Sequence, residues 1–182
     1  MKYIYTTLVA TLMFAGTSFA ETINVPGDHA TIQGAIDASS DGDIIAVAAG
    51  TYYEFDINPF GKAITVQGTL NKDGSLATTI NANGGGSVFF FEYGGVSGEI
   101  KDLVITGGSS SYGGGIYCRD NSSPTISNCT ITGNTANYGG GINCWNSNPT
   151  ITDCTIEDNE GVSGGGIYCD NNSNTTISGC TI

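Results

Sequence analysis

The chain has 182 residues, 28 of them glycine, and a net charge of −12. This acidic balance argues against binding to nucleic acid or to acidic polysaccharides, which carry charge of the same sign. Hydrophobic residues make up 39% of the chain, which is too many for a disordered tail, so one folded domain is expected.

Residues 1–20 have the pattern of a secretory signal peptide. Lys2 supplies a positive charge, an apolar stretch follows, and Ser18-Phe19-Ala20 places small residues where a signal peptidase cleaves. The stretch is too short to cross a bilayer, which takes roughly 20 apolar residues, and no later segment is longer. The sequence therefore predicts an exported protein whose mature domain is residues 21–182, with no transmembrane segment.

Residues 31–38 are the one segment with a helical pattern. Ile32, Ala35 and Ile36 share one face, and Asp28 is a candidate for the N-terminal cap. An apolar strand is expected at 44–47. Residues 69–86 depart from the repeat, and residues 71–75 are interpreted as an insertion that loops out of the second coil. The strand pattern then resumes at residues 87–92.

A repeat of 25 or 26 residues occupies the second half of the chain. The element Gly-Gly-Gly-Ile-x-Cys begins at residues 113, 139 and 164. The six cysteines fall into two columns of the repeat: Cys118, Cys144 and Cys169 in one, and Cys129, Cys154 and Cys180 in the other. Leu103 takes the cysteine position one unit upstream, which indicates an apolar, interior site.

Each unit contains short segments of alternating pattern between Gly, Asn, Asp and Ser clusters, which predicts strands and turns. One turn column holds residues that tolerate a left-handed backbone: Asp102, Asn128, Asp153 and Gly179. Three short strands per unit, joined by tight bends, predict one coil of a solenoid. The fold class is therefore all-β, a parallel β-helix of about five coils, with residues 31–38 as a short helix that caps the N-terminal coil.

Stacked coils place equivalent residues about 4.8 Å apart, so identical residues form ladders. Asn134 and Asn159 are expected to share amide hydrogen bonds in this way. The cysteines form either two buried thiol columns or, since export favours oxidation, disulfides between the columns. The chain stops at Ile182 within a unit, so it is expected to be part of a longer protein.

The strand after the triple glycine has a candidate binding face. If Ile116 and Cys118 point inward, their neighbours point outward. The outward candidates for glycan binding are Tyr117, Arg119, Asn143, Trp145, Tyr168 and Asp170. The one tryptophan would stack on sugar rings and the polar side chains would bond hydroxyl groups; alternatively the face is an ordinary ladder with Arg119 stacked on Trp145.

Four acidic residues near one bend form a candidate calcium site: Asp153, Glu157, Asp158 and Glu160. The alternative is a solvated acidic turn, and no other cofactor is expected. Glycoside hydrolysis generally uses a pair of carboxylates on one face. The sequence shows no such cluster, so no catalytic residue is assigned.

The cap segment, Gly42-Asp43, and the repeated GGGIYC and SPTISNCTITGN elements resemble secreted bacterial proteins of the pectin-lyase-like superfamily. Within it they are similar to proteins with polymorphic-outer-membrane-protein-type repeats, in which Gly114-Gly115-Ile116 and Ile131-Thr132-Gly133-Asn134 have counterparts. The resemblance implies a right-handed single-stranded parallel β-helix. It also implies either a surface adhesin or passenger region, or an enzyme that acts on polysaccharides.

The expected function is an exported, non-catalytic scaffold at the bacterial cell surface or outer membrane, or secreted from the cell. Its expected partners are extracellular polysaccharide or the surface of a host or neighbouring cell. The alternative is the N-terminal part of a pectate-lyase-like or polygalacturonase-like enzyme whose active site lies in coils beyond Ile182.

Overall fold

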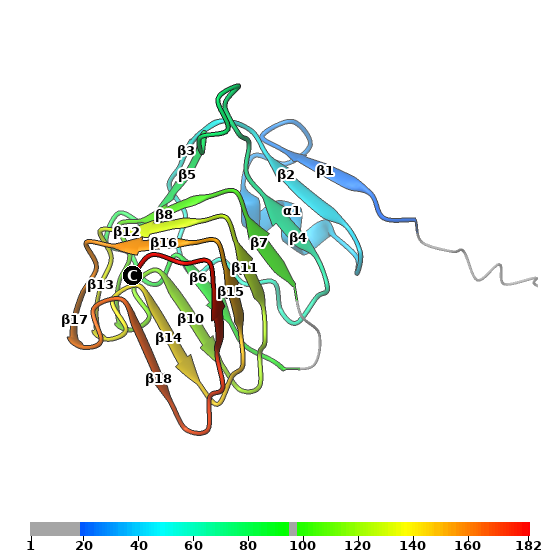
Figure 1. Cartoon of the computed structure of the whole chain (residues 1–182). Helices are drawn as coiled ribbons and strands as arrows, with labels where there is room; N and C mark the ends of the chain where they lie inside the picture. Colours follow the sequence, from blue (N-terminus) through cyan, green and yellow to red (C-terminus); the bar gives the residue numbers. More distant parts are fainter. Residues whose placement is uncertain (1–18, 95–97) are drawn as a thin grey trace, which may run out of the picture.

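The computed structural model describes residues 19–94 and 98–182. Apart from Phe19 and Ala20, the predicted signal peptide lies outside these residues. The described chain winds into a parallel β-solenoid of about six turns with one short helix at its N-terminal end (Figure 1). The predicted all-β fold with a capping helix is confirmed, with one more turn than expected.

Two sheets run along the length of the solenoid, and all of their strand pairs are parallel. The seven-stranded sheet has the order β1 (Thr22–Val25), β2 (Ile44–Val47), β4 (Thr65–Gln67), β7 (Glu99–Lys101), β11 (Thr125–Ser127), β15 (Thr150–Thr152) and β19 (Thr176–Ser178). The five-stranded sheet has the order β16 (Thr155–Glu157), β12 (Thr130–Thr132), β8 (Val104–Thr106), β5 (Thr78–Asn81) and β3 (Gly50–Tyr52).

Two shorter parallel sheets complete the later coils. The four-stranded sheet has the order β18 (Ile167–Asp170), β14 (Ile142–Trp145), β10 (Ile116–Arg119) and β6 (Phe89–Phe91). The three-stranded sheet has the order β17 (Glu160–Ser163), β13 (Thr135–Tyr138) and β9 (Ser109–Tyr112). The prediction of three strands per coil is therefore wrong for these coils, which have four. The additional strands carry mostly exposed side chains and show no apolar alternation.

The turns follow the predicted columns. Asp102, Asn128 and Asp153 have φ values of 60°, 47° and 52°, in the left-handed region. Asn128 Nδ2 also donates a 2.7 Å hydrogen bond to Asp102 Oδ1 in the coil before it. Short polar side chains bond neighbouring turns and tolerate this backbone, which explains why the column is Asp or Asn.

The core consists of isoleucine ladders inside the coils. Ile100, Ile126 and Ile151 are paired in register across the seven-stranded sheet, and none of them is exposed to solvent. Ile116 and Ile142 form an equivalent pair on the four-stranded sheet. A one-residue shift in register would move a whole ladder to the outside, so burial of these side chains sets the register of the outward face as well.

The insertion predicted at residues 71–75 lies in a small hairpin. Leu70 and Leu76 form an isolated antiparallel bridge that closes this hairpin. The prediction that all of residues 69–86 depart from the repeat is wrong, because residues 78–81 are strand β5 of the regular five-stranded sheet, with Thr78 and Ile80 buried. Residues 87–92 resume the repeat as predicted, because Phe89 on β6 pairs with Ile116 on β10.

The helix α1 (Ile32–Ala38) packs against β1 and β2 and buries the three apolar residues predicted for its inner face. Its N-cap is Thr31, whose Oγ1 accepts a 3.1 Å hydrogen bond from Gly34 N, and not Asp28. The Asp28 carboxylate instead accepts bonds from the backbone and side chain of Asn24, which lower its pKa. Because the Asp28 carboxylate is already bonded within this local turn, it does not cap the helix. Thr31, which directly precedes the helix, is the N-cap instead.

Side chains of the following coil bond both ends of α1. The Glu54 carboxylate accepts from Ile32 N at 2.8 Å and from Gln33 N at 3.1 Å. Lys62 Nζ donates to the carbonyls of Ile36, Asp37 and Ser39 at 2.6, 3.1 and 2.9 Å. Both charges have the sign that stabilises the helix end they contact. No helix within residues 19–94 and 98–182 is long and apolar enough to span a membrane.

Candidate functional site

The triple glycine forms a corner with no room for side chains. Gly113 and Gly139 have φ values of 53° and 64°. A Cβ atom on Gly140 would lie 2.3 Å from the carbonyl oxygen of Glu160. The backbone can therefore turn sharply here between the three-stranded and the four-stranded sheet. This turn brings the side chain before the glycines close to the outward face of the strand after them.

Aromatic rings fill the angle at this corner. Tyr112 stacks on Tyr117 with 5.6 Å between ring centroids, and Tyr117 stacks on Phe90 at 5.4 Å. In the next coil, Tyr138 lies 5.4 Å from Tyr112 and 5.3 Å from Tyr168. Five rings from successive coils thus form a continuous row at distances typical of favourable aromatic contacts.

A groove of about 250 Å³ lies beside this row, and its lining defines what we call the aromatic groove: Tyr112, Tyr138, Trp145, Tyr168 and Asp170. Three of the predicted candidates therefore come together, namely Trp145, Tyr168 and Asp170. Tyr112 and Tyr138 were not predicted. Their signal in the sequence is a tyrosine directly before the triple glycine in two successive units.

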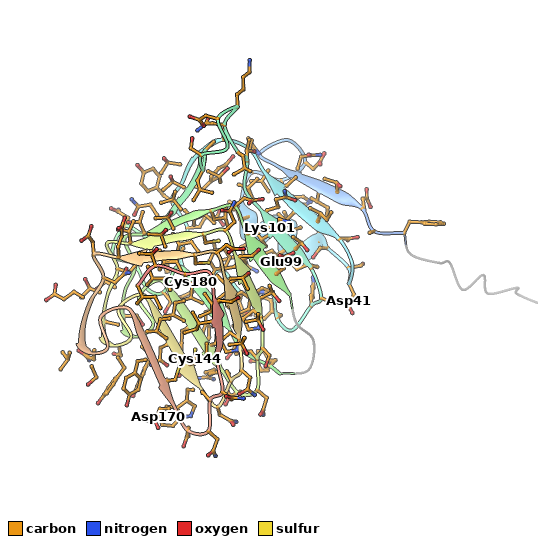
Figure 2. All side chains as sticks on the ribbon, in the orientation of Figure 1. Asp41, Glu99, Lys101, Cys144, Asp170 and Cys180 are labelled. Carbon is orange, nitrogen blue, oxygen red and sulfur yellow. The ribbon has the colours of Figure 1, made fainter. Side chains whose placement is uncertain are left out.

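The polar end of the aromatic groove is formed by Asp170 at the end of β18, which Figure 2 shows on the outer edge of the molecule. Tyr168 Oη donates a 3.3 Å hydrogen bond to Asp170 Oδ2. Burial, and then the neighbouring carboxylate, raises the pKa of Tyr168, which adds to the preference of a tyrosine for its protonated form at neutral pH. The groove therefore offers ring faces, a hydroxyl group and a carboxylate.

Two predicted binding residues have other roles. Asn143 was expected to face solvent, but it is completely buried, and its amide Oδ1 and Nδ2 have no hydrogen-bond partner within the described part of the chain. It lies in register between Tyr117 and Tyr168, whose larger side chains exclude water from it. Arg119 does not stack on Trp145; its Cζ lies 5.3 Å from the ring centroid of Phe90.

The cysteines form two columns of free thiols, and all six are free. Cys118 and Cys144 point into the core with no exposed surface, and Figure 2 shows Cys144 inside the coil. Burial raises the pKa of Cys118 well above its usual range. In the second column, Cys129 Sγ donates to the carbonyl of Ser127 at 3.2 Å. The thiols act as small apolar side chains that also bond the turn carbonyls.

Cys169 is expected to be the first thiol to react in the folded protein. It is exposed, and its interactions with the neighbouring Cys144 thiol and with the Thr175 hydroxyl group, 3.2 Å away, lower its pKa, which favours the reactive thiolate. Iodoacetamide at neutral pH should modify one thiol rapidly, and close to six after denaturation. Peptide mapping should place the rapid label on Cys169. A rapid label that persists in Cys169→Ser would contradict this assignment.

The four calcium candidates are all exposed and lie on separate elements. Asp153 is in the turn before β16, Glu157 ends β16, Asp158 follows it, and Glu160 begins β17. Within residues 19–94 and 98–182 the structure holds no group of three or more Asp, Glu, His or Cys side chains arranged to bind a metal ion. The structure thus does not bring these carboxylates together.

A second hollow, of about 630 Å³, lies over β1, β2 and β4 near the capping helix. Its lining contains no aromatic and no charged side chain, so it offers little for specific recognition. The aromatic groove is smaller but combines rings with polar groups. It holds a single carboxylate among its lining residues, whereas glycoside hydrolysis generally uses two.

Comparison with known proteins supports the architecture. No curated protein and no solved structure matches this chain. A family model described as right handed beta helix region matches residues 29–182, which include α1 and every coil that follows it. The chain therefore belongs to the right-handed β-helix family.

Proposed function

We propose that this protein is a non-catalytic β-helix scaffold that binds glycans in the aromatic groove. The observation that carries the proposal is the arrangement of Tyr112, Tyr138, Trp145 and Tyr168 around one hollow, with Asp170 at its end. Faces of sugar rings are apolar enough to stack on aromatic rings, while their hydroxyl groups need polar partners. The rings are held on paired strands, so little conformational freedom is lost on binding.

The proposal includes export to the cell surface. The signal pattern in residues 1–20 supports secretion. The resemblance of the repeats to polymorphic-outer-membrane-protein-type repeats in the pectin-lyase-like superfamily supports an adhesin or passenger region at the bacterial outer membrane. Its partner would be an extracellular polysaccharide or the glycan-covered surface of a host or neighbouring cell.

The single tryptophan provides a direct test, because Trp145 lines the aromatic groove and no other tryptophan contributes fluorescence. The purified protein should change its tryptophan emission in a saturable way when titrated with soluble oligosaccharides. The panel should contain neutral, amino-sugar and uronic-acid oligomers of equal length. Calorimetry of the same mixtures gives the affinity without relying on the fluorophore.

Tyr138→Ala and Trp145→Ala are each expected to weaken glycan binding about tenfold, which corresponds to about 1.4 kcal/mol for one lost stacking ring. Tyr53→Ala is the matched control, because Tyr53 is 71% exposed and lies outside the groove. Its affinity should equal that of the unmodified protein. If no oligomer in the panel binds, or if the Tyr53 variant loses as much affinity as the Tyr138 variant, the proposed function is wrong.

A further inference from the structure

The aromatic groove has an unbalanced negative charge. Asp170 is its one charged lining residue and is exposed to solvent. Within the described chain, the cationic side chains are Lys62, Lys72, Lys101 and Arg119. None of these four lines the groove.

The lysines lie on other parts of the solenoid. Lys62 donates to the carbonyls at the end of α1, and Lys72 is in the hairpin closed by Leu70 and Leu76. Lys101 belongs to β7 on the seven-stranded sheet, and Figure 2 shows it well separated from Asp170. No lysine is therefore placed to neutralise an acidic ligand in the groove.

Arg119 is on the same sheet as the groove, but carboxylates of its own chain neutralise it. Its Nη2 lies 3.1 Å from Glu92 Oε2, and its Nε lies 2.9 Å from Asp120 Oδ2. The Nε contact is an ion pair without the alignment of a hydrogen bond. The guanidinium also lies over the ring of Phe90. Two carboxylates and one guanidinium give this cluster a net negative charge, which adds to the charge of Asp170.

We propose that the groove selects glycans that carry protonated amino groups and discriminates against polymers of uronic acids. This inference rests on the proposed function of the same groove. An ammonium group on a stacked sugar would meet the Asp170 carboxylate and the faces of the surrounding tyrosine and tryptophan rings, which both attract cations. A uronate carboxylate would meet Asp170 with no free cation nearby, and like charges at such a site repel.

The test compares three oligomers of equal length at a mildly acidic pH, at which the amine is protonated: a glucosamine oligomer, a neutral glucose oligomer and a galacturonate oligomer. The glucosamine oligomer is expected to bind about fivefold more tightly than the neutral one, as for one exposed ion pair. The galacturonate oligomer should bind most weakly. Added salt should reduce these differences, because it screens exposed charges.

Asp170→Asn removes the negative charge of the side chain and nearly keeps its shape. The amide keeps an oxygen acceptor for the 2.7 Å hydrogen bond that Asn171 N donates to Oδ1, so the local turn is retained. This variant should lose the preference, so that the glucosamine oligomer and the neutral oligomer bind with similar affinity. Asp158→Asn, which removes an exposed charge outside the groove, should keep the preference.

The outcomes distinguish the two proposals. Equal binding of all three oligomers, tightest binding of the galacturonate oligomer, or an unchanged preference in Asp170→Asn would each overturn the charge selectivity, while glycan binding in the groove would stand. Absence of binding by every oligomer would overturn the proposed function itself and this inference with it.

Discussion

Replacing Asn134 with alanine is expected to destabilise the solenoid by about 3 kcal/mol, because it leaves two or more buried backbone groups without a partner. Asn134 is only 1% exposed. Its Oδ1 accepts a 2.9 Å bond from Gly108 N, and its Nδ2 donates to the carbonyl of Ile105 at 3.0 Å. Nδ2 also lies 3.0 Å from Oδ1 of Asn159, which forms the ladder expected from the repeat.

Urea unfolding followed by circular dichroism measures this effect as a shift in the midpoint at constant slope. Asn174→Ala is the matched control, because Asn174 is exposed and the structure shows no hydrogen bond from its side chain within the described residues. That variant should change stability by less than about 0.5 kcal/mol. Equal midpoints for the two variants would show that the ladder does not stabilise the fold.

Gly139→Ala is expected to destabilise the protein by about 3 kcal/mol, of which about 1 kcal/mol is the ordinary strain of a non-glycine residue in a left-handed conformation. The remainder is steric, because a Cβ atom on Gly139 would lie 2.1 Å from the carbonyl oxygen of Ile142. The corner must open to relieve this overlap. Since Tyr138 directly precedes the corner and lines the aromatic groove, glycan affinity should fall together with stability.

Gly74→Ala isolates the steric contribution. Gly74 also has a left-handed φ, of 84°, but a Cβ atom there would contact nothing within 4 Å. This control should destabilise by about 1 kcal/mol and leave glycan affinity unchanged. A Gly139→Ala variant that unfolds at the same urea concentration as Gly74→Ala would contradict the role of the corner as a site of close backbone packing.

The repeat was sufficient to predict the architecture because a solenoid is built from contacts between neighbouring coils. Each coil contacts its neighbours, so a column such as Ile100, Ile126 and Ile151 in the sequence becomes a ladder in space. The Asp, Asn and Gly residues between strands also identified the left-handed turns, since few other residues tolerate that backbone conformation. The cap was identified by its helical pattern, although its N-cap is Thr31 and not Asp28.

The candidate site was only partly predictable. Alternation along one strand placed Trp145, Tyr168 and Asp170 outside, and this was enough to suggest a surface that stacks on sugars. The alternation of inward and outward side chains does not predict which neighbours cover an outward side chain. Asn143 is outward by register yet buried, because larger side chains stand on both sides of it in neighbouring coils.

The sequence by itself therefore determined the coils, the inward isoleucine and cysteine columns, the turns and the tryptophan on the outer face. These depend on the period of the repeat and on which residues can be buried. Only the tertiary structure decided that a fourth strand per coil brings Tyr112 and Tyr138 to the groove, and that Arg119 pairs with Glu92 and Asp120. The position of the two tyrosines depends on the angle that the glycine corner sets between two sheets, because contacts across that angle join side chains that no period along the chain relates. The Glu92 contact instead runs along one sheet, where the register of β6 with β10 places Glu92 beside Arg119.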